Sequence, residues 1–348
     1  MTKKRFALAV LALTILAGSG WVYSTYRGKW GVLRNQVSAW WNSLDYPVAG
    51  AQPEDPNSVK LGVGAAIGKR FFPDDNPWNQ DISQEQVDPL SNLILERIGL
   101  QTPVHPEYGT FYRGAPNGIP YMVVSGDQPK VPITFSRYGA ESDPGPYPIP
   151  LNAPIEGGPD GKGDRHVCVL DRDNWKLYEL FDARPNAQGG WTAAGGAIFD
   201  LKSNKLRTQG WSSCDAAGLP ILPGLVRYDE VHVKKEINHA LRFTVARTRK
   251  AFVPPATHYA SFRTQVDFPP MGARFRLRAN FDMTGYPDEV KVVLHALQKY
   301  GMIVADNGGD MFISGAPDPR WNDLKNHEIK KVRARDFEVL KMKNMVID

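Results

Sequence analysis

The sequence has few residues of the kinds that bind metals or cross-link a small fold: two cysteines and seven histidines in 348 residues. Two cysteines exclude a disulfide-rich scaffold and a four-thiolate zinc site. Lys and Arg number 42 against 37 Asp and Glu, and no run of five or six like charges occurs. This balance argues against a dedicated nucleic-acid-binding protein. A charged content of 23% beside 42% hydrophobic residues is typical of a globular chain rather than a disordered one.

The N-terminus combines basic residues with an apolar stretch. Lys3, Lys4 and Arg5 precede an apolar stretch from Phe6 to Leu16, which is typical of a bacterial export signal. Small residues at 17–19 offer a cleavage site, but the low-charge stretch continues to Tyr23, long enough for an uncleaved transmembrane signal anchor. Both interpretations predict export, to the periplasm with an inner-membrane anchor or as a secreted protein.

The rest of the chain predicts one β-rich domain. We expect a signal peptide or signal anchor over residues 1–23, a tether over 24–69 and a single domain over 70–348. Residues 273–281 alternate strictly, with Phe275 and Leu277 on one face and arginines on the other, as in a half-buried antiparallel strand. Helices are predicted over 83–98 and 287–300, and a hairpin over 302–313. Short strands between turn signals favour an antiparallel β-sandwich or jelly-roll with a few peripheral helices.

Several catalytic motifs do not occur. The chain has no G-x-S-x-G and no H-E-x-x-H sequence. The glycines at 62–68 have the wrong spacing for a dinucleotide site. His232, Glu236 and His239 would share a helix face, but the segment resembles a hairpin turn. We therefore expect no metal site and no cofactor.

Acidic residues supply the leading functional hypothesis. Glycoside hydrolases use two carboxyl groups, one kept protonated by an apolar environment. Residues 211–231 place Asp215, Asp229 and Glu230 in an otherwise apolar segment, and we predict these three as catalytic. The predicted substrate-binding residues are Trp211, His239, Arg242, Arg276, Arg278 and Asp306. An arginine ladder on a strand suits a polysaccharide substrate, including an anionic one.

Two other classes of function stay open. A non-catalytic glycan-binding or envelope-assembly module would keep the aromatic and basic surface without an acid pair. A hydrolase or lyase could instead use His166, His239 or His258 with a tyrosine. The expected partners are a polysaccharide and the inner membrane, with no nucleic acid. Cys168 and Cys214 either pair in an oxidising compartment or stay buried thiols.

Three stretches together resemble a known family. They are residues 163–182, residues 215–230 with the sequence Asp-Ala-Ala-Gly-Leu-Pro-Ile-Leu-Pro-Gly at its start, and residues 300–321. Over about residues 70–340 the chain is similar to a largely uncharacterised family of exported soil-bacterial proteins. The resemblance implies one large exported domain, and it carries over no activity, cofactor or catalytic residue.

Overall fold

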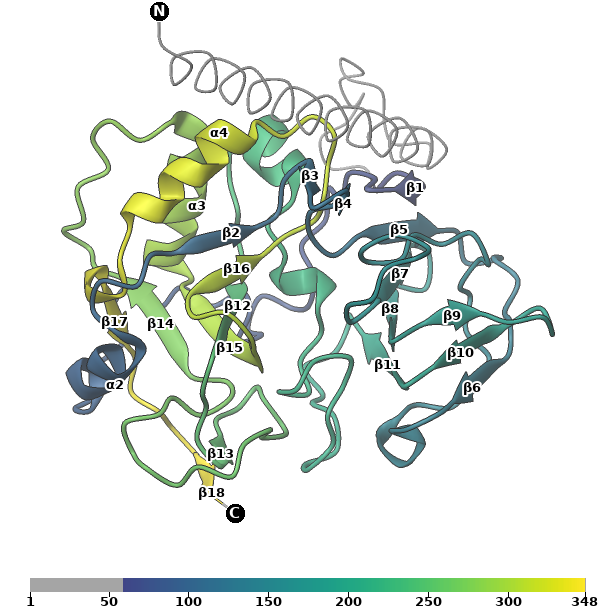
Figure 1. The fold of residues 1–348 in the computed structure, drawn as a ribbon, viewed down its shortest axis with the longest axis horizontal. Helices are drawn as coiled ribbons and strands as arrows, with labels where there is room; N and C mark the ends of the chain where they lie inside the picture. Colours follow the sequence, from purple (N-terminus) through teal and green to yellow (C-terminus); the bar gives the residue numbers. More distant parts are fainter. Residues whose placement is uncertain (1–58, 348) are drawn as a thin grey trace, which may run out of the picture. The chain divides into compact units, whose positions relative to one another are not determined.

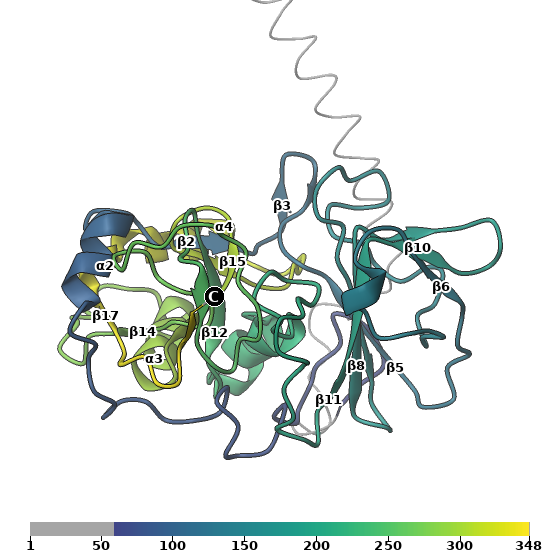
Figure 2. The same cartoon turned by 90° about the horizontal axis from the view of Figure 1, so that it is seen from below.

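The fold consists mainly of short strands, and the computed structural model describes it for residues 59–347. A six-stranded sheet contains, in spatial order, β17 (Phe337–Val339), β14 (Arg274–Leu277), β15 (Met302–Asn307), β12 (Leu241–Val245), β16 (Phe312–Ser314) and β2 (His105–Glu107). A five-stranded sheet contains β1 (Gly62–Val63), β5 (Tyr121–Val124), β7 (Val167–Asp171), β8 (Lys176–Phe181) and β11 (Gly195–Asp200). Figures 1 and 2 both show these two sheets on opposite sides of the view.

Smaller elements complete the fold. A three-stranded sheet contains β6 (Ile133–Phe135), β10 (Trp191–Ala193) and β9 (Arg184–Pro185), and two strand pairs join β13 (Ala251–Phe252) to β18 (Val346–Ile347) and β3 (Phe111–Tyr112) to β4 (Ala115–Pro116). The α-helices are α2 (Ser91–Ile98), α3 (Asp288–Lys299) and α4 (Asp323–Asn326). Short 3₁₀ segments cover Gly139–Glu141, Leu222–Gly224, His327–Lys331 and Ala334–Asp336, and a π-helix covers Asp229–Lys234.

The mainly-β prediction is confirmed, whereas the antiparallel sandwich or jelly-roll is not. Parallel pairs occur in three of the sheets: β12 with β15, β5 with β7, β16 with β2 and β10 with β6. The predicted hairpin over 302–313 is wrong, because β15 and β16 lie on either side of β12 rather than against each other. Long-range pairing with β12 thus overrides the local turn signal.

Alternation along β12 decides which side chains reach the core. Leu241, Phe243 and Val245 are fully buried and belong to the largest apolar cluster. Helix α3 adds Val293 and Leu297 to the same cluster, as the predicted 3.6-residue period requires. The intervening residues of β12 must therefore face the other side of the sheet.

The first predicted helix is shorter than expected. Helix α2 begins at Ser91, and Val87 instead forms an isolated bridge with Leu340. Pro89 accounts for the late start, because the residue before a proline disfavours the helical conformation. Residues 83–90 of the predicted helix therefore lie outside α2.

The structure also bears on the predicted N-terminal segments. Val63, Ala65 and Ile67 are buried, and β1 pairs with β5, so residues 59–69 belong to the folded body although they were assigned to the tether. The transmembrane signal-anchor interpretation has no support in the described part of the chain: no helix within residues 59–347 is both long and apolar enough to cross a bilayer. The stretch from Phe6 to Tyr23, on which that interpretation rested, lies outside the described residues.

Candidate active site

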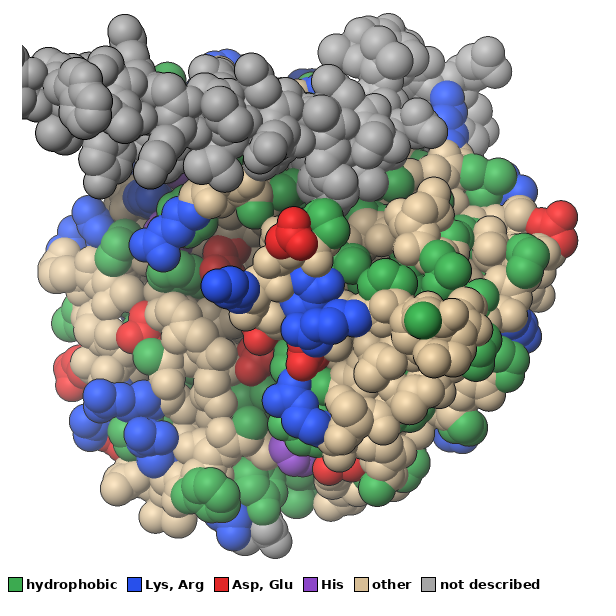
Figure 3. Space-filling model, turned by 45° about the vertical axis from the view of Figure 1, so that its right-hand side comes forward, with side chains coloured by type: hydrophobic (Ala, Val, Ile, Leu, Met, Phe, Trp, Pro, Cys, Tyr) green, Lys and Arg blue, Asp and Glu red, His purple; other side chains and the backbone are tan. Residues whose placement is uncertain are grey.

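A pocket of about 360 Å³ is lined by strands of the six-stranded sheet and by loops that lead into the five-stranded sheet. Its acidic side chains are Glu107, Glu156, Asp164 and Asp306, and its cationic side chains are His166 and Arg242. Acidic and basic side chains also gather near the middle of the face shown in Figure 3. A concave site with convergent charged groups is the default position for chemistry in a protein of this kind.

One wall of the pocket is a row of polar residues on the six-stranded sheet. Arg242 and Thr244 alternate with the core residues of β12 and therefore share the opposite face. Asp306 of β15 pairs with Thr244, and Glu107 of β2 pairs with Ser314 of β16. Strand register thus brings four strands' polar side chains to one surface.

The other wall consists of loops around residues 115–119 and 156–166. Gly118 has a φ of 127°, and a Cβ at this position would lie 2.4 Å from the Gly315 carbonyl oxygen. The adjacent Ile119 amide donates to that same oxygen over 2.9 Å. Glycine is therefore required for the loop to close against the sheet at the pocket.

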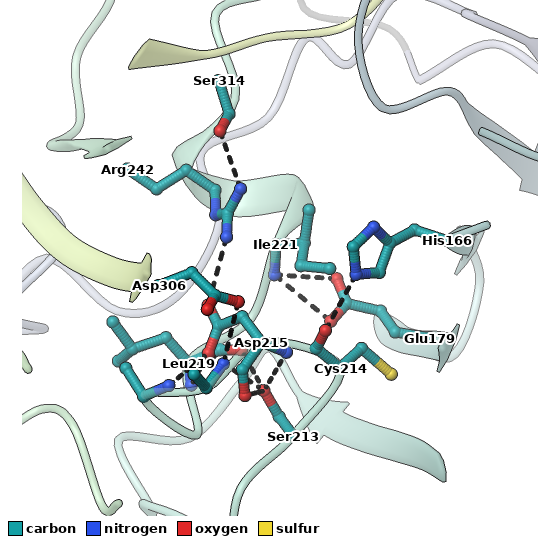
Figure 4. Close-up of polar contacts among 12 residues, drawn as sticks. His166, Glu179, Ser213, Cys214, Asp215, Leu219, Ile221, Arg242, Asp306 and Ser314 are labelled. Atoms are coloured by element: carbon teal, nitrogen blue, oxygen red, sulfur yellow. Dashed lines mark hydrogen bonds and ion pairs between the residues drawn. The ribbon is translucent and has the colours of Figure 1, made fainter. Parts of the chain in front are cut away.

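Arg242 is the central cation of the pocket. Its guanidinium donates to Ser314 Oγ over 2.7 Å and lies 3.6 Å from Asp215 Oδ2, as Figure 4 shows. The side chain is almost fully buried, and its Nε has no hydrogen-bond partner among the described residues. A buried guanidinium fixed at both ends acts as a permanent positive charge beside the pocket acids.

Glu107 and Asp306 are two pocket carboxyls whose pKa values are both raised by burial. Burial raises the pKa of Glu107, opposed by Arg242 and reinforced by Glu156 and Asp164. The Glu107 residue keeps solvent-exposed area, so this burial reflects the surrounding pocket walls. Burial also raises the pKa of Asp306, while Arg242 and two backbone amides oppose the shift. Those amides, of Ala216 and Asn307, donate to Asp306 over 3.1 and 2.7 Å and favour its ionised form.

His166 and Glu156 form an ion pair at the floor of the pocket. His166 Nδ1 lies 2.6 Å from Glu156 Oε2, and Nε2 lies 2.9 Å from the Cys214 carbonyl oxygen. Burial would lower the pKa of His166, but the charge and hydrogen bond of Glu156 outweigh it and raise this pKa to about 9. The same attraction outweighs burial at Glu156 and lowers its pKa. A protonated imidazole that donates from both nitrogens cannot serve as a general base.

Similarity to other proteins does not assign the pocket a role. No protein-family model, curated protein or solved structure matches the chain. The resemblance to exported soil-bacterial proteins therefore stays a prediction, and function has to be argued from the pocket residues themselves.

Asp215, predicted as catalytic, lies behind the pocket rather than in it. Its side chain is fully buried, and Oδ1 accepts from the Ala217 and Leu219 amides over 3.1 and 2.9 Å. Burial raises the pKa of Asp215 to about 7, against the attraction of Arg242. The carboxyl organises the turn at 215–219 and supports Arg242, so it contacts the site only through another residue.

Asp229 and Glu230 are not in an open groove either. Arg227 Nη2 lies 2.7 Å from Glu230 Oε1 and Arg227 Nε lies 3.5 Å from Asp229 Oδ1, with all three side chains buried. Asp229 also accepts from the Ile67 amide over 3.0 Å, and His239 Nε2 lies 3.2 Å from both Glu230 oxygens. The prediction of these two acids, and of His239, as site residues is corrected, because the cluster binds only protein groups.

The predicted arginine ladder stabilises the fold rather than forming a trough. Arg276 donates to the carbonyls of Ile82 and Ser83 and pairs with Glu338 over 2.7 Å. Arg278 pairs with the same glutamate over 3.2 Å. Trp211 is half-buried, with the Arg207 guanidinium 5.8 Å from its ring centre. Of the six predicted binding residues, only Arg242 and Asp306 line the pocket.

Sequence reasoning missed Glu107, Glu156 and Asp164. Glu107 ends a three-residue strand at the edge of the six-stranded sheet, too short to show an alternating pattern in the sequence. Glu156 and Asp164 are the first and last residues of a glycine-rich loop without helix or strand. One signal in the sequence pointed to the pocket. Arg242 and Thr244 alternate with the apolar Leu241 and Phe243, so they lie on the opposite face of the strand from the core.

Both cysteines are free and buried, and they lie near the carboxyl group of Glu179.

Glu179 is fully buried and accepts from the Ile221 and Leu222 amides over 2.9 and 3.1 Å. Burial raises the pKa of Glu179 to about 7, although both amides favour the ionised form. The proton that this residue keeps couples folding to pH.

This coupling predicts that stability falls as pH rises from 4.5, the ordinary pKa of Glu179, to about 7. In that window the native state holds a proton that the unfolded chain has released. The raised pKa of Asp215 lowers the free energy of unfolding in the same way between pH 3.8 and about 7. The raised pKa of His166 does so between pH 6.5 and about 9. The side chain introduced by Glu179→Gln is neutral at every pH, so the free energy of unfolding of this variant should depend less on pH. At pH 8 it should exceed that of the unmodified protein by on the order of 3 kcal/mol. Urea denaturation across this range measures the effect.

A matched control is Glu96→Gln, on the exposed side of α2. It should leave the pH dependence of unfolding as in the unmodified protein. Parallel curves for Glu179→Gln and the unmodified protein would contradict the assignment of a retained proton to Glu179.

Proposed function

We propose that the chain hydrolyses a glycosidic bond with Glu107 and Asp306 as its paired carboxyl groups. The observation that carries the proposal is that both carboxyls line one open pocket and neither is held in an ion pair within the described residues. Glycoside hydrolysis needs this combination, one protonated and one ionised carboxyl at the same bond.

The surroundings assign the two roles. The Glu107 carboxyl accepts no hydrogen bond among the described residues and has two acidic neighbours, Glu156 and Asp164, which favour its protonated form. Asp306 receives two amide hydrogen bonds and the charge of Arg242, which favour its ionised form. Glu107 is therefore the proton donor, and Asp306 is the base or nucleophile.

In the reaction, Glu107 gives its proton to the leaving glycosidic oxygen while the bond to the anomeric carbon breaks. Asp306 either takes a proton from the attacking water or attacks the anomeric carbon itself. Arg242 stabilises the charge on Asp306, and Tyr112, 59% exposed at the pocket, offers a ring on which a sugar can stack.

The test is release of reducing ends from a panel of oligosaccharides, followed across pH. We expect turnover with a bell-shaped profile, because Asp306 must be ionised and Glu107 must be protonated. Binding of an oligosaccharide without any product would overturn the hydrolytic proposal and favour a glycan-binding module.

A further inference from the structure

The charge around the pocket is not balanced by the protein. His166 pairs with Glu156, and Arg242 lies against Asp215 behind the wall. Glu107 holds the proton of the proposed pair and Asp306 has the attraction of Arg242, so within residues 59–347 Asp164 is the pocket acid left without a partner of opposite charge. The chain as a whole carries a net charge of +5, so the local excess of acid is opposite in sign to the protein.

Such an arrangement disfavours an anionic polymer and favours a cation. A uronate or sulfate in the pocket would add like charge beside carboxylates that burial already penalises. A protonated amine would instead neutralise one of them and donate hydrogen bonds to its carboxylate oxygens. The three acids do not form a group that could hold a metal ion, a finding that covers the described residues.

A second observation indicates what else the ligand carries. Arg242 is only 3% exposed and lines the pocket, yet its Nε has no acceptor among the described residues. A guanidinium N–H calls for an oxygen acceptor, such as a hydroxyl or a carbonyl. Tyr112 adds an exposed ring that suits the C–H face of a sugar. An amino sugar has all three of these features: an amine, an oxygen acceptor and an apolar C–H face.

We infer that the substrate of this pocket is a saccharide with a free amine, bound by Asp164 beside the reacting carboxyls. The inference rests on the proposed hydrolytic function and specifies its substrate class. Asp164 is an exposed pocket residue outside the acid and base pair, which makes it the binding group that can be changed without removing the proposed chemistry.

The experiment compares oligomers of glucosamine, of N-acetylglucosamine and of galacturonic acid by calorimetry and by turnover with the full chain. The glucosamine oligomer should bind roughly tenfold tighter than its acetylated form, and the preference should weaken in about 0.15 M salt. Asp164→Asn should remove most of this preference by raising KM, with little change in kcat on the acidic side of the profile, where Glu107 keeps its proton without the charge of Asp164. Asp200→Asn, an exposed aspartate outside the pocket, is the matched control and should behave like the unmodified protein.

Equal binding of all three oligomers, or a preference for the uronate, would overturn the inference. Turnover of the acetylated oligomer in that case would leave the hydrolytic proposal intact. Tight binding of glucosamine oligomers without turnover of any oligomer would have the opposite meaning, since it supports the ligand class and contradicts hydrolysis.

Discussion

Glu107→Gln is expected to lower kcat by about 10²- to 10⁴-fold, the usual contribution of a positioned proton donor. Glutamine keeps the shape of the side chain but has no proton to give to the leaving oxygen. The melting temperature should not change, because the Glu107 residue retains exposed area and its carboxyl accepts no hydrogen bond among the described residues. Initial rates and thermal unfolding of the same preparation check both statements.

The pH profile separates the two members of the pair. Activity depends on a protonated Glu107, so Glu107→Gln should abolish the alkaline limb of the remaining activity. Asp306→Asn should abolish the acidic limb, because Asp306 acts in its ionised form. Glu96→Gln on α2 provides the control with both limbs unchanged. Full activity of Glu107→Gln would show that the pocket does not use this carboxyl.

Glu230→Ala is expected to lower the free energy of unfolding by about 3–5 kcal/mol, since it leaves Arg227 buried with one partner fewer. Arg227 Nη2 and His239 Nε2 both lose their carboxylate contact in this variant. The folded fraction should retain its turnover, because Glu230 does not line the pocket. Urea denaturation gives the stability, and rates normalised to folded protein give the activity.

Glu236→Gln is a suitable comparison, as an exposed acid just after the same π-helix. It should change neither stability nor turnover. If Glu230→Ala instead lost turnover while its unfolding curve stayed in place, Glu230 would return to the catalytic role that the sequence predicted.

The elements that sequence predicted well are those with a local cause. Helix α3 has apolar residues at helical spacing, and β14, within the alternating segment 273–281, pairs antiparallel with both of its neighbours. In each case the pattern lies within one continuous segment of the chain. The failure of the hairpin over 302–313 has the opposite cause, because β12, some 60 residues earlier, lies between its two predicted strands.

The site was harder to predict because its residues meet only through long-range pairing. An apolar segment with three acids looked catalytic, yet Asp229 and Glu230 are balanced by Arg227 from the same segment. Whether an acid is neutralised by a near neighbour cannot be read from apolar surroundings alone. Glu107 and Asp306 share a pocket through the order of β2, β16, β12 and β15, which no local pattern encodes.

The pocket draws its walls from segments near residues 107–119, 156–166, 242–244 and 306–314. No fragment confined to either large sheet contains all of them. Ligand occupancy is consequently linked to the intact assembly, and a bound saccharide would resist separation of the two sheets by mass action. Under the proposed function, bound substrate should therefore slow proteolysis of the folded protein, and cleavage within any of these four segments should weaken substrate binding.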